Sequence, residues 1–327
     1  MKPCLPVTTY IDIHLRNIKS RCAVTLSPHV PCSRILKTYP PWIVLVFILG
    51  SFSEAQELHG SAVVVAFNSN EMVIAADSRT TDGTGVPSPI PYCKIRRHGH
   101  VFFAVTNTLA DAKTGYDVYA VIETALRPNI DFAGNVIAVE SALKSALFNE
   151  LQASYIRRVS QGLAFNPKQY GLLFMLAAFD RKEPTLVIRK LEWPSAIFTL
   201  DMPNQLIPEK SVDCPPKCDS IDGLTVYGIG ETDNMNPILG MRRFSQFSPV
   251  DIARFFVTLE AFSIPTVGSP IDIVRITKDK TCWIQYKKQG EGCETDIPEC
   301  PCASTSTHKP IPAKPTHTPT KPRRKRS

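Results

Sequence analysis

The sequence predicts an α+β fold in which two antiparallel sheets lie face to face between two layers of helices, a four-layer αββα sandwich. Two observations predict it. Apolar, β-branched runs come in pairs separated by short turn signals, as in the hairpins of antiparallel sheets. Segments with helical spacing also come in pairs, each placed between groups of strands, so that each pair can cover one face of a sheet.

The first half of the folded region is expected to form two hairpins and then two helices. An Asn-Ser-Asn turn and a His-Gly-His turn separate the strands of the hairpins, and Pro128 and Gly162 follow the helices. The expected strands are 61–67, 72–76, 94–97 and 101–105, and the expected helices are 109–126 and 132–159.

The second half repeats this order with strands, a helix pair and a closing hairpin. Pro249 occupies the first turn of the last helix, a position where proline is favoured. The expected strands are 171–179, 185–190, 196–200, 224–227, 271–277 and 281–287, and the expected helices are 236–244 and 249–262.

Charge and composition divide the chain into three parts. We expect a leader over 1–55, a folded domain over 56–290, and a Cys-containing segment with a disordered Pro/Thr/basic tail over 291–327. The formal net charge is +7, but both ends are basic and the body between them is slightly acidic. The charge therefore predicts no nucleic-acid-binding surface on the fold.

The leader contains a short apolar run, Trp42–Phe52, with Arg34 and Lys37 before it and small residues at 53–55 after it. A basic stretch, a short apolar core and a small-residue site are typical of a secretory signal. The run is shorter than the roughly 20 residues that a membrane-spanning helix needs. We expect an exported protein, secreted or periplasmic, without stable membrane insertion. A retained membrane anchor and a buried strand are the alternatives.

Seven of the ten cysteines follow the leader, and their spacing matches no common zinc site. In an exported protein they are expected to form disulfides. A disulfide between a cysteine of the 214/218 loop and one of the 293–302 segment would attach the C-terminal segment to the domain. Cys93 and Cys282 lie in expected strands and are expected to be buried and inert.

Several motifs together resemble the proteasome β-subunit family and related bacterial peptidases, which are N-terminal nucleophile (Ntn) hydrolases. The main ones are GSAVVVAF at 60–67 and VIAADSRTTDG at 73–83. Lys94-Ile95, the Leu-Ala-Asp at 109–111 and the Gly-Ile-Gly-Glu at 228–231 match later family positions. The resemblance covers about 60–287 and implies the proteasome-type sandwich.

The resemblance also implies chemistry. Ser61 takes the position of the nucleophile, usually Thr, which becomes the first residue when the chain is cleaved after Gly60. Its own α-amine, with a pKa near 8, can act as the base. Asp77 and Lys94 take the positions of the Asp and Lys that support it. The implied activity is that of a threonine-peptidase-type hydrolase acting on a peptide or amide. The resemblance implies neither a cofactor nor a metal. It implies that the chain can form a homo-oligomer.

Departures from the family pattern keep a second function open. Asn107 or Thr108 stands where a glycine supplies the oxyanion N–H, and Ile229 replaces a serine. Ile264 and Val267 replace an aspartate and a serine that support the nucleophile's amine. A catalytically inactive proteasome-fold scaffold or binding protein is therefore the alternative.

The three candidate residues each have a simpler interpretation. Asp77 could cap a turn and pair with Arg79 or Lys94 without a catalytic role. Lys94 could face solvent from a strand, and Ser61 could be an ordinary first-strand residue in an unprocessed chain. A shift of one residue would place Ala62 at the mature start.

Overall fold

The structure is a computed structural model. It describes residues 57–59, 62–81, 92–167, 170–180, 183–194, 198, 206–216, 218, 220–221, 223–239, 247–264, 267–287 and 296–301. The apolar run Trp42–Phe52, almost all of the tail, and the predicted processing site Gly60 and nucleophile Ser61 lie outside these residues.

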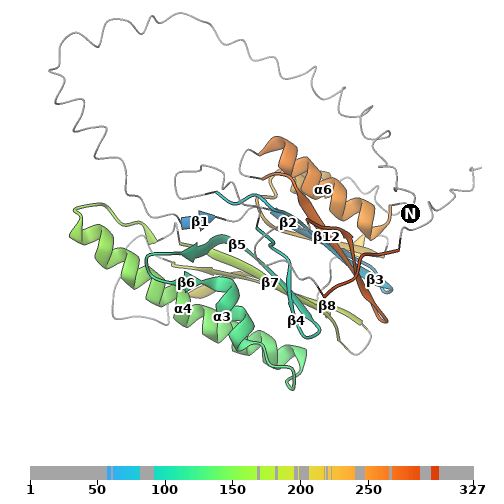
Figure 1. The fold of residues 1–327 in the computed structure, drawn as a ribbon, viewed down its shortest axis with the longest axis horizontal. Coiled ribbons are helices and arrows are strands. Elements are labelled where there is room, and N and C mark those ends of the chain that lie inside the picture. The colour runs from blue at the N-terminus through green and yellow to red at the C-terminus, as the bar shows by residue number, and fades with distance from the viewer. Residues whose placement is uncertain are drawn as a thin grey trace, which may run out of the picture. The chain divides into compact units, whose positions relative to one another are not determined.

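Two antiparallel sheets form the centre of the described fold, which is of the α+β class (Figure 1). The first sheet has the order β1-β5-β7-β8-β9, and β4 and β6 also pair with β5. Its strands are β1 (Glu57–His59), β4 (Arg96–His98), β5 (Val101–Asp111), β6 (Tyr116–Asp117), β7 (Leu172–Asp180), β8 (Glu183–Glu192) and β9 (Ile207–Cys214).

The second sheet has the order β10-β11-β2-β3-β12-β13. Its strands are β2 (Ala62–Phe67), β3 (Glu71–Asp77), β10 (Ser220–Ile221), β11 (Leu224–Gly230), β12 (Ile271–Thr277) and β13 (Thr281–Gln285). Strand β2 is buried along its whole length because both faces of the sheet are covered. Its register pairs Val63 with Ala76, which brings the start of β2 beside the end of β3.

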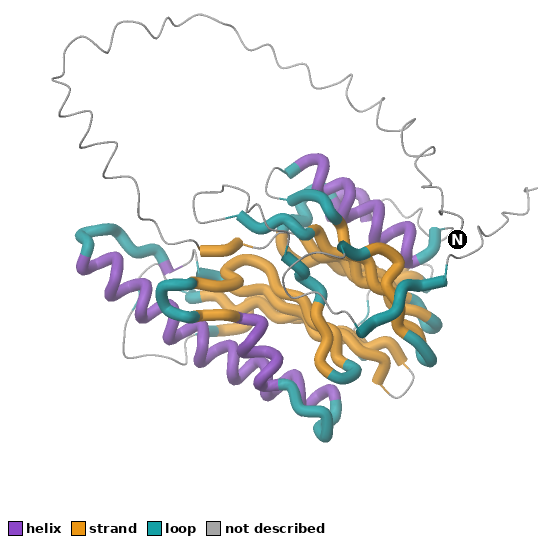
Figure 2. Tube along the Cα trace, viewed as in Figure 1, coloured by secondary structure: helices purple, strands orange, loops and turns teal. Residues whose placement is uncertain are grey.

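Four helices flank these sheets in the part of the chain that the structure describes (Figure 2). They are α3 (Val118–Ala125), α4 (Phe132–Ser160), α5 (Met235–Leu239) and α6 (Pro249–Ser263). Asp117, Asp131 and Ser248 accept hydrogen bonds from the first-turn amides of α3, α4 and α6, so each of these helices begins at a good N-cap.

Three apolar clusters connect these elements. One joins α3 and α4 to the outer face of the first sheet, around Phe103 and Leu147. A second lies between the two sheets, around Val65 and Met175. The third joins α5 and α6 to the other face of the second sheet, around Val64 and Phe256.

Most predicted elements are present, with specific corrections. The helix predicted over 109–126 was wrong in its first part, because β5 continues to Asp111 and α3 begins at Val118. Strands β1, β6, β9 and β10 were not predicted, and β6 lies within the predicted helix. Of the strand predicted at 196–200, only Phe198 is described, and the helix predicted over 236–244 is described as far as Leu239.

The disulfides differ from the predicted pairing. Cys214 bonds to Cys218, and Cys282 bonds to Cys300. Cys93 is also disulfide-bonded. The prediction that the 214/218 loop pairs with the C-terminal segment was therefore wrong. Cys93 and Cys282 are buried, as expected, but both are disulfide-bonded. Disulfides are typical of proteins that mature in an oxidising compartment.

The segment 296–300 packs on the domain. The N–H of Trp283 donates to the carbonyl of Pro298 (2.8 Å), and the N–H of Cys300 donates to the carbonyl of Trp283 (2.7 Å). Ile297 is buried in the cluster between the sheets. In the described part of the chain, each helix is too short or too polar to span a lipid bilayer.

Candidate active site

The candidate site lies where β2 begins and β3 ends. Asp77 is the last residue of β3, and its Oδ1 accepts a hydrogen bond from the N–H of Ala62, the first residue of β2, at 3.0 Å. The pairing of β2 with β3 imposes this contact. Asp77 thus lies against the residue that directly follows the predicted nucleophile, Ser61.

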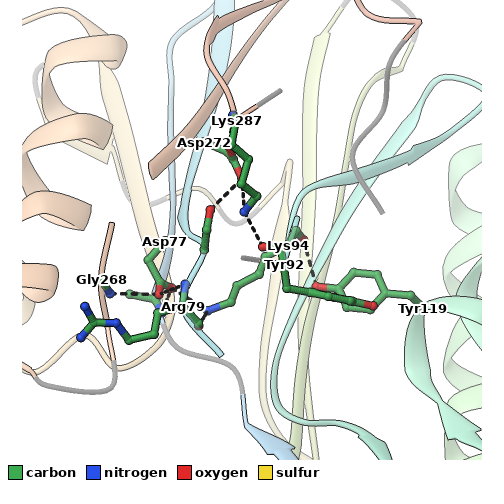
Figure 3. Close-up of polar contacts among 10 residues, drawn as sticks. Asp77, Arg79, Tyr92, Lys94, Tyr119, Gly268, Asp272 and Lys287 are labelled. Carbon is green, nitrogen blue, oxygen red and sulfur yellow. Dashed lines mark hydrogen bonds and ion pairs between the residues drawn. The ribbon is translucent and has the colours of Figure 1, made fainter. Parts of the chain in front are cut away.

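Lys94 reaches the same oxygen from another part of the chain (Figure 3). Its Nζ lies 2.8 Å from Oδ1 of Asp77, and it also donates to the carbonyl oxygen of Arg79. Both side chains of the pair are 0% exposed. Lys94 precedes β4 rather than belonging to it, and the interpretation of Lys94 as a solvent-facing strand residue is excluded.

The second oxygen of Asp77 orders the neighbouring loops. Its Oδ2 accepts from the N–H of Arg79 at 3.1 Å and from the N–H of Gly268 at 3.2 Å. Gly268 follows Val267, in the loop where the resemblance implies a polar side chain. Here the loop supplies a backbone donor to the carboxylate. Asp77 therefore caps this turn and pairs with Lys94, as its simpler interpretation expects, and it also binds the N–H groups of Ala62 and Gly268.

The charge of Lys94 is strongly affected by its surroundings. Burial removes water from the ammonium and lowers its pKa, and this effect exceeds the opposing attraction of Asp77 and Asp272. Lys94 can therefore lose its proton more readily than an exposed lysine. A lysine with a lowered pKa can take part in a reaction either as the charged ammonium or as the neutral amine.

A second buried ion pair lies beside the first, and the sequence analysis missed it. Nζ of Lys287 is 3.2 Å from Oδ2 of Asp272, and the hydroxyl of Ser78 donates to the same oxygen at 2.9 Å. Ser78 directly follows Asp77 in the chain. The sequence carried no motif for this group, because Ser78 and Asp272 are 194 residues apart.

An aromatic group holds the backbone of Lys94. The hydroxyl of Tyr119 on α3 donates to the carbonyl of Lys94 at 3.0 Å. The guanidinium of Arg96 lies 4.3 Å from the ring centre of Tyr119 and 5.2 Å from that of Tyr92, in cation–π contact with both. Arg96 also bonds to the Tyr92 hydroxyl and to Glu123. The position of the Lys94 backbone is thus fixed from the helical layer.

Asn107 has the backbone conformation that a glycine would favour. Its φ is +75°, the only positive φ at a non-glycine residue in the described chain. Asparagine tolerates this left-handed region better than most residues. The resemblance implies a glycine with an oxyanion-binding N–H at Asn107 or Thr108. A glycine-like backbone conformation is therefore present at one of these two positions.

The remaining departures, Ile229, Ile264 and Val267, are apolar, and Ile264 is only partly buried. Val267 is fully buried, and Ile229 lies in the cluster between the sheets. Neither side chain can bond to an amine. Gly228 and Gly230 belong to β11, so the Gly-Ile-Gly sequence forms the end of a strand. Among the described residues, no group of three or more His, Cys, Asp or Glu side chains gathers as a metal site.

Comparisons with known proteins add little to this geometry. No known protein family matches the chain, and no curated protein matches it. Among solved structures, the chain is similar to Anbu, an ancestral β-subunit, from Yersinia bercovieri. The two are 16% identical with a TM-score of 0.41, over 69% of this chain and 88% of that one.

Proposed function

We propose that this protein is an amide hydrolase of the N-terminal nucleophile type, with a proteasome-type αββα sandwich and Ser61 as its nucleophile. Cleavage after Gly60 would free the α-amine of Ser61. One observation carries the proposal: Oδ1 of Asp77 binds both the N–H of Ala62 and Nζ of Lys94, with both side chains fully buried. This joins a buried cation to the residue next to Ser61.

The energetics of the pair favour a functional role. Burying two charges costs solvation free energy, and apolar side chains of similar size often stabilise a fold equally well or better. Apolar residues Ala62, Ala76 and Ile95 are buried around the pair, together with the second ion pair, Asp272–Lys287. A site in such a core that retains a lysine and an aspartate is a candidate for chemistry that uses their charges.

In the proposed reaction, Oγ of Ser61 attacks the carbonyl carbon of the amide while the Ser61 α-amine takes the hydroxyl proton. The protonated amine then gives this proton to the leaving nitrogen, and an ester to Ser61 remains. Water, deprotonated by the same amine, cleaves the ester and releases the acid. The nearby Lys94 ammonium favours the neutral, basic form of the amine.

The negative charge that forms on the carbonyl oxygen needs a donor. The N–H groups of Asn107 and Thr108 on β5 are the candidates, because Asn107 has the glycine-like conformation. A backbone donor keeps its position when the side chain changes. The replacement of glycine by asparagine therefore supports retention of the oxyanion site, with a narrower space for the substrate.

A second candidate function, a catalytically silent binding protein, is favoured by one observation. Strand β1, which ends at His59, pairs with β5 at Thr108, Ala110 and Asp111. The uncleaved chain therefore occupies the edge of β5, next to the candidate oxyanion donors. If cleavage never occurs, the site stays covered and the Ser61 amine does not exist.

We also propose that the protein is exported, that its substrate is a peptide or amide, and that it associates with copies of itself. The disulfides support export. Retention of the apolar run as an anchor predicts that carbonate extraction leaves the protein in the membrane fraction, whereas export predicts its release. Light scattering on the purified protein would detect self-association, and a strict monomer would contradict it.

The proposal is tested by the N-terminus of the protein recovered from its native compartment, together with its hydrolysis of fluorogenic peptide amides. We expect a chain that begins at Ser61 and is active. Ser61→Thr keeps a hydroxyl nucleophile and should retain activity, whereas Ser61→Ala should abolish it. A native chain that begins at or before Gln56 would overturn the hydrolase and support the binding protein.

A further inference from the structure

We propose that the Asp272–Lys287 pair is a positioning unit of the candidate site, which holds Asp77 and Lys94 in contact and acts electrostatically on the Lys94 ammonium. Its role in catalysis rests on the proposed function, but its action on Lys94 does not. Neither residue belongs to the motifs that the sequence analysis recognised.

The pair belongs to a closed ring of hydrogen bonds (Figure 3). Ser78 Oγ donates to Asp272 Oδ2, and Lys287 binds Asp272 through both its N–H (3.0 Å) and its Nζ. Nζ of Lys287 also donates to the carbonyl of Tyr92 at 2.7 Å. The N–H of Tyr92 donates to the carbonyl of Ser78 at 3.0 Å, which closes the ring.

The ring joins the two chain segments that carry the candidate site. Ser78 adjoins Asp77, and Tyr92 lies two residues before Lys94. The contact between Asp77 and Lys94 therefore depends on how firmly these segments are held together. Asp272, the second residue of β12, and Lys287, which follows β13, supply the crosslink.

The ring is also placed to act through charge. Ser78 is 0% exposed, Asp272 1% and Lys287 8%, so water screens their interactions weakly. The groups that act on Lys94 are Asp77 on β3, Arg79 after it, Asp272 on β12 and Lys287 after β13. The Tyr119 hydroxyl on α3 contacts the Lys94 carbonyl.

The two members of the pair should affect Lys94 in opposite directions. Asp272 raises the pKa of Lys94, in opposition to the dominant effect of burial, and Lys287 and Lys94 repel one another. Removing the carboxylate should therefore lower the pKa of Lys94, and removing the second ammonium should raise it. Shifts of opposite sign would show that the pair acts on Lys94 through charge, and not only through the packing of the fold.

The test is an NMR titration of the full chain with isotope-labelled lysine side chains, in which Lys94→Arg identifies the Lys94 signal. We expect the Lys94 pKa to fall in Asp272→Asn and to rise in Lys287→Met. Arg275→Met is the matched control, because Arg275 pairs with Glu71 between the same two strands, β12 and β3, at their far end. It should leave the Lys94 pKa unchanged.

The inference is overturned if both variants titrate like the control, or if both shift the Lys94 pKa in the same direction. Should Asp272→Asn fail to fold, folded Lys287→Met decides alone, and an unchanged pKa there overturns the inference. In an active enzyme the alkaline limb of kcat/KM should move with the Lys94 pKa. Opposite shifts in a protein without amidase activity would reject the proposed function and keep this inference.

Discussion

Nζ of Lys94 lies 2.8 Å from Oδ1 of Asp77, and neither side chain is exposed to solvent. Oδ1 and Oδ2 of Asp77 also accept backbone N–H donors from three segments. The carboxylate is thus stabilised by donors even without the lysine, whereas the ammonium depends mainly on the carboxylate for its charge.

Substitutions in this pair should be strongly coupled. We expect Lys94→Met or Asp77→Asn alone to cost about 3–5 kcal/mol of unfolding free energy, because each leaves one buried charge without its partner. The double variant should cost clearly less than the sum of the two, and should be inactive. Urea denaturation of the four proteins measures the coupling.

The partly exposed pair Glu140–Lys144 on α4, in which Glu140 also lies near Arg189, is the control for this cycle. Its coupling should stay below about 0.5 kcal/mol, as is typical of surface pairs four residues apart on a helix. If the Asp77–Lys94 coupling is equally small, the buried pair does not behave as an ion pair.

Glu150 should make stability depend on pH. Burial raises the pKa of this carboxyl above 4.5, and nearby Asp111 contributes. Between 4.5 and the raised value the native state binds more protons than the unfolded state, so stability from this group falls as pH rises. Glu150→Gln carries no charge and keeps one of the two oxygen acceptors that bind Thr114 and Ser154.

We therefore expect Glu150→Gln to gain stability relative to the native chain between about pH 5 and about pH 8. Urea denaturation at both pH values measures this difference. Glu183→Gln, at an exposed position on β8, is the control and should show none. A gain that is the same at both pH values would contradict the assignment to titration of Glu150.

A side chain at Gly268 would have to displace the end of the Arg79 side chain. An added Cβ would lie 2.3 Å from Cζ and 2.4 Å from Nε of Arg79, while the N–H of Gly268 must still reach Asp77. We expect Gly268→Ala to cost about 1–3 kcal/mol through overpacking and to slow hydrolysis. Gly171→Ala, whose Cβ would have only ordinary contacts from 3.8 Å, should be tolerated. Thermal unfolding and the rate on a fluorogenic amide measure both effects.

The two disulfides should differ in their contribution to stability. Cys282–Cys300 closes a longer loop than Cys214–Cys218, with sequence separations of 18 and 4. Loop-closure entropy predicts losses of about 3 and about 2 kcal/mol when each pair is replaced by alanine. Removing the longer one should also release Ile297 from the core. Guanidinium denaturation under oxidising conditions measures both losses of unfolding free energy. A larger loss for the Cys214–Cys218 pair than for the Cys282–Cys300 pair would contradict the entropic account.

The sequence could predict the parts of the fold whose pattern is local. Strands β2 and β3 are continuous apolar runs, and α4 has clear helical spacing and a cap. Strand β9 was missed because its sequence, IPEKSVDC, is polar and contains Pro208; it lies at the edge of its sheet, where proline is tolerated. The last residues of β5 were mistaken for a helix, because Leu109–Asp111 matched a family helix start.

The residues of the candidate site likewise fall into a group that the sequence could predict and a group that it could not. Asp77 and Lys94 were predicted because each lies in a recognisable motif. Asp272 and Lys287 were missed because their partners come from segments far away in the chain, and no spacing rule connects them. The φ of Asn107 depends on the neighbouring strands, so its glycine-like conformation could not be read from the residue type alone.

The pairing of β1 with β5 gives the proposed cleavage a delayed effect. Strands β1 and β2 belong to different sheets, so cutting after Gly60 would sever the chain between them without removing β1. The severed segment that carries β1 would remain attached to β5 through backbone hydrogen bonds, and it would have to dissociate before a substrate could take its place. A newly matured molecule would thus pass through a latent period, whose length is set by the release of this segment.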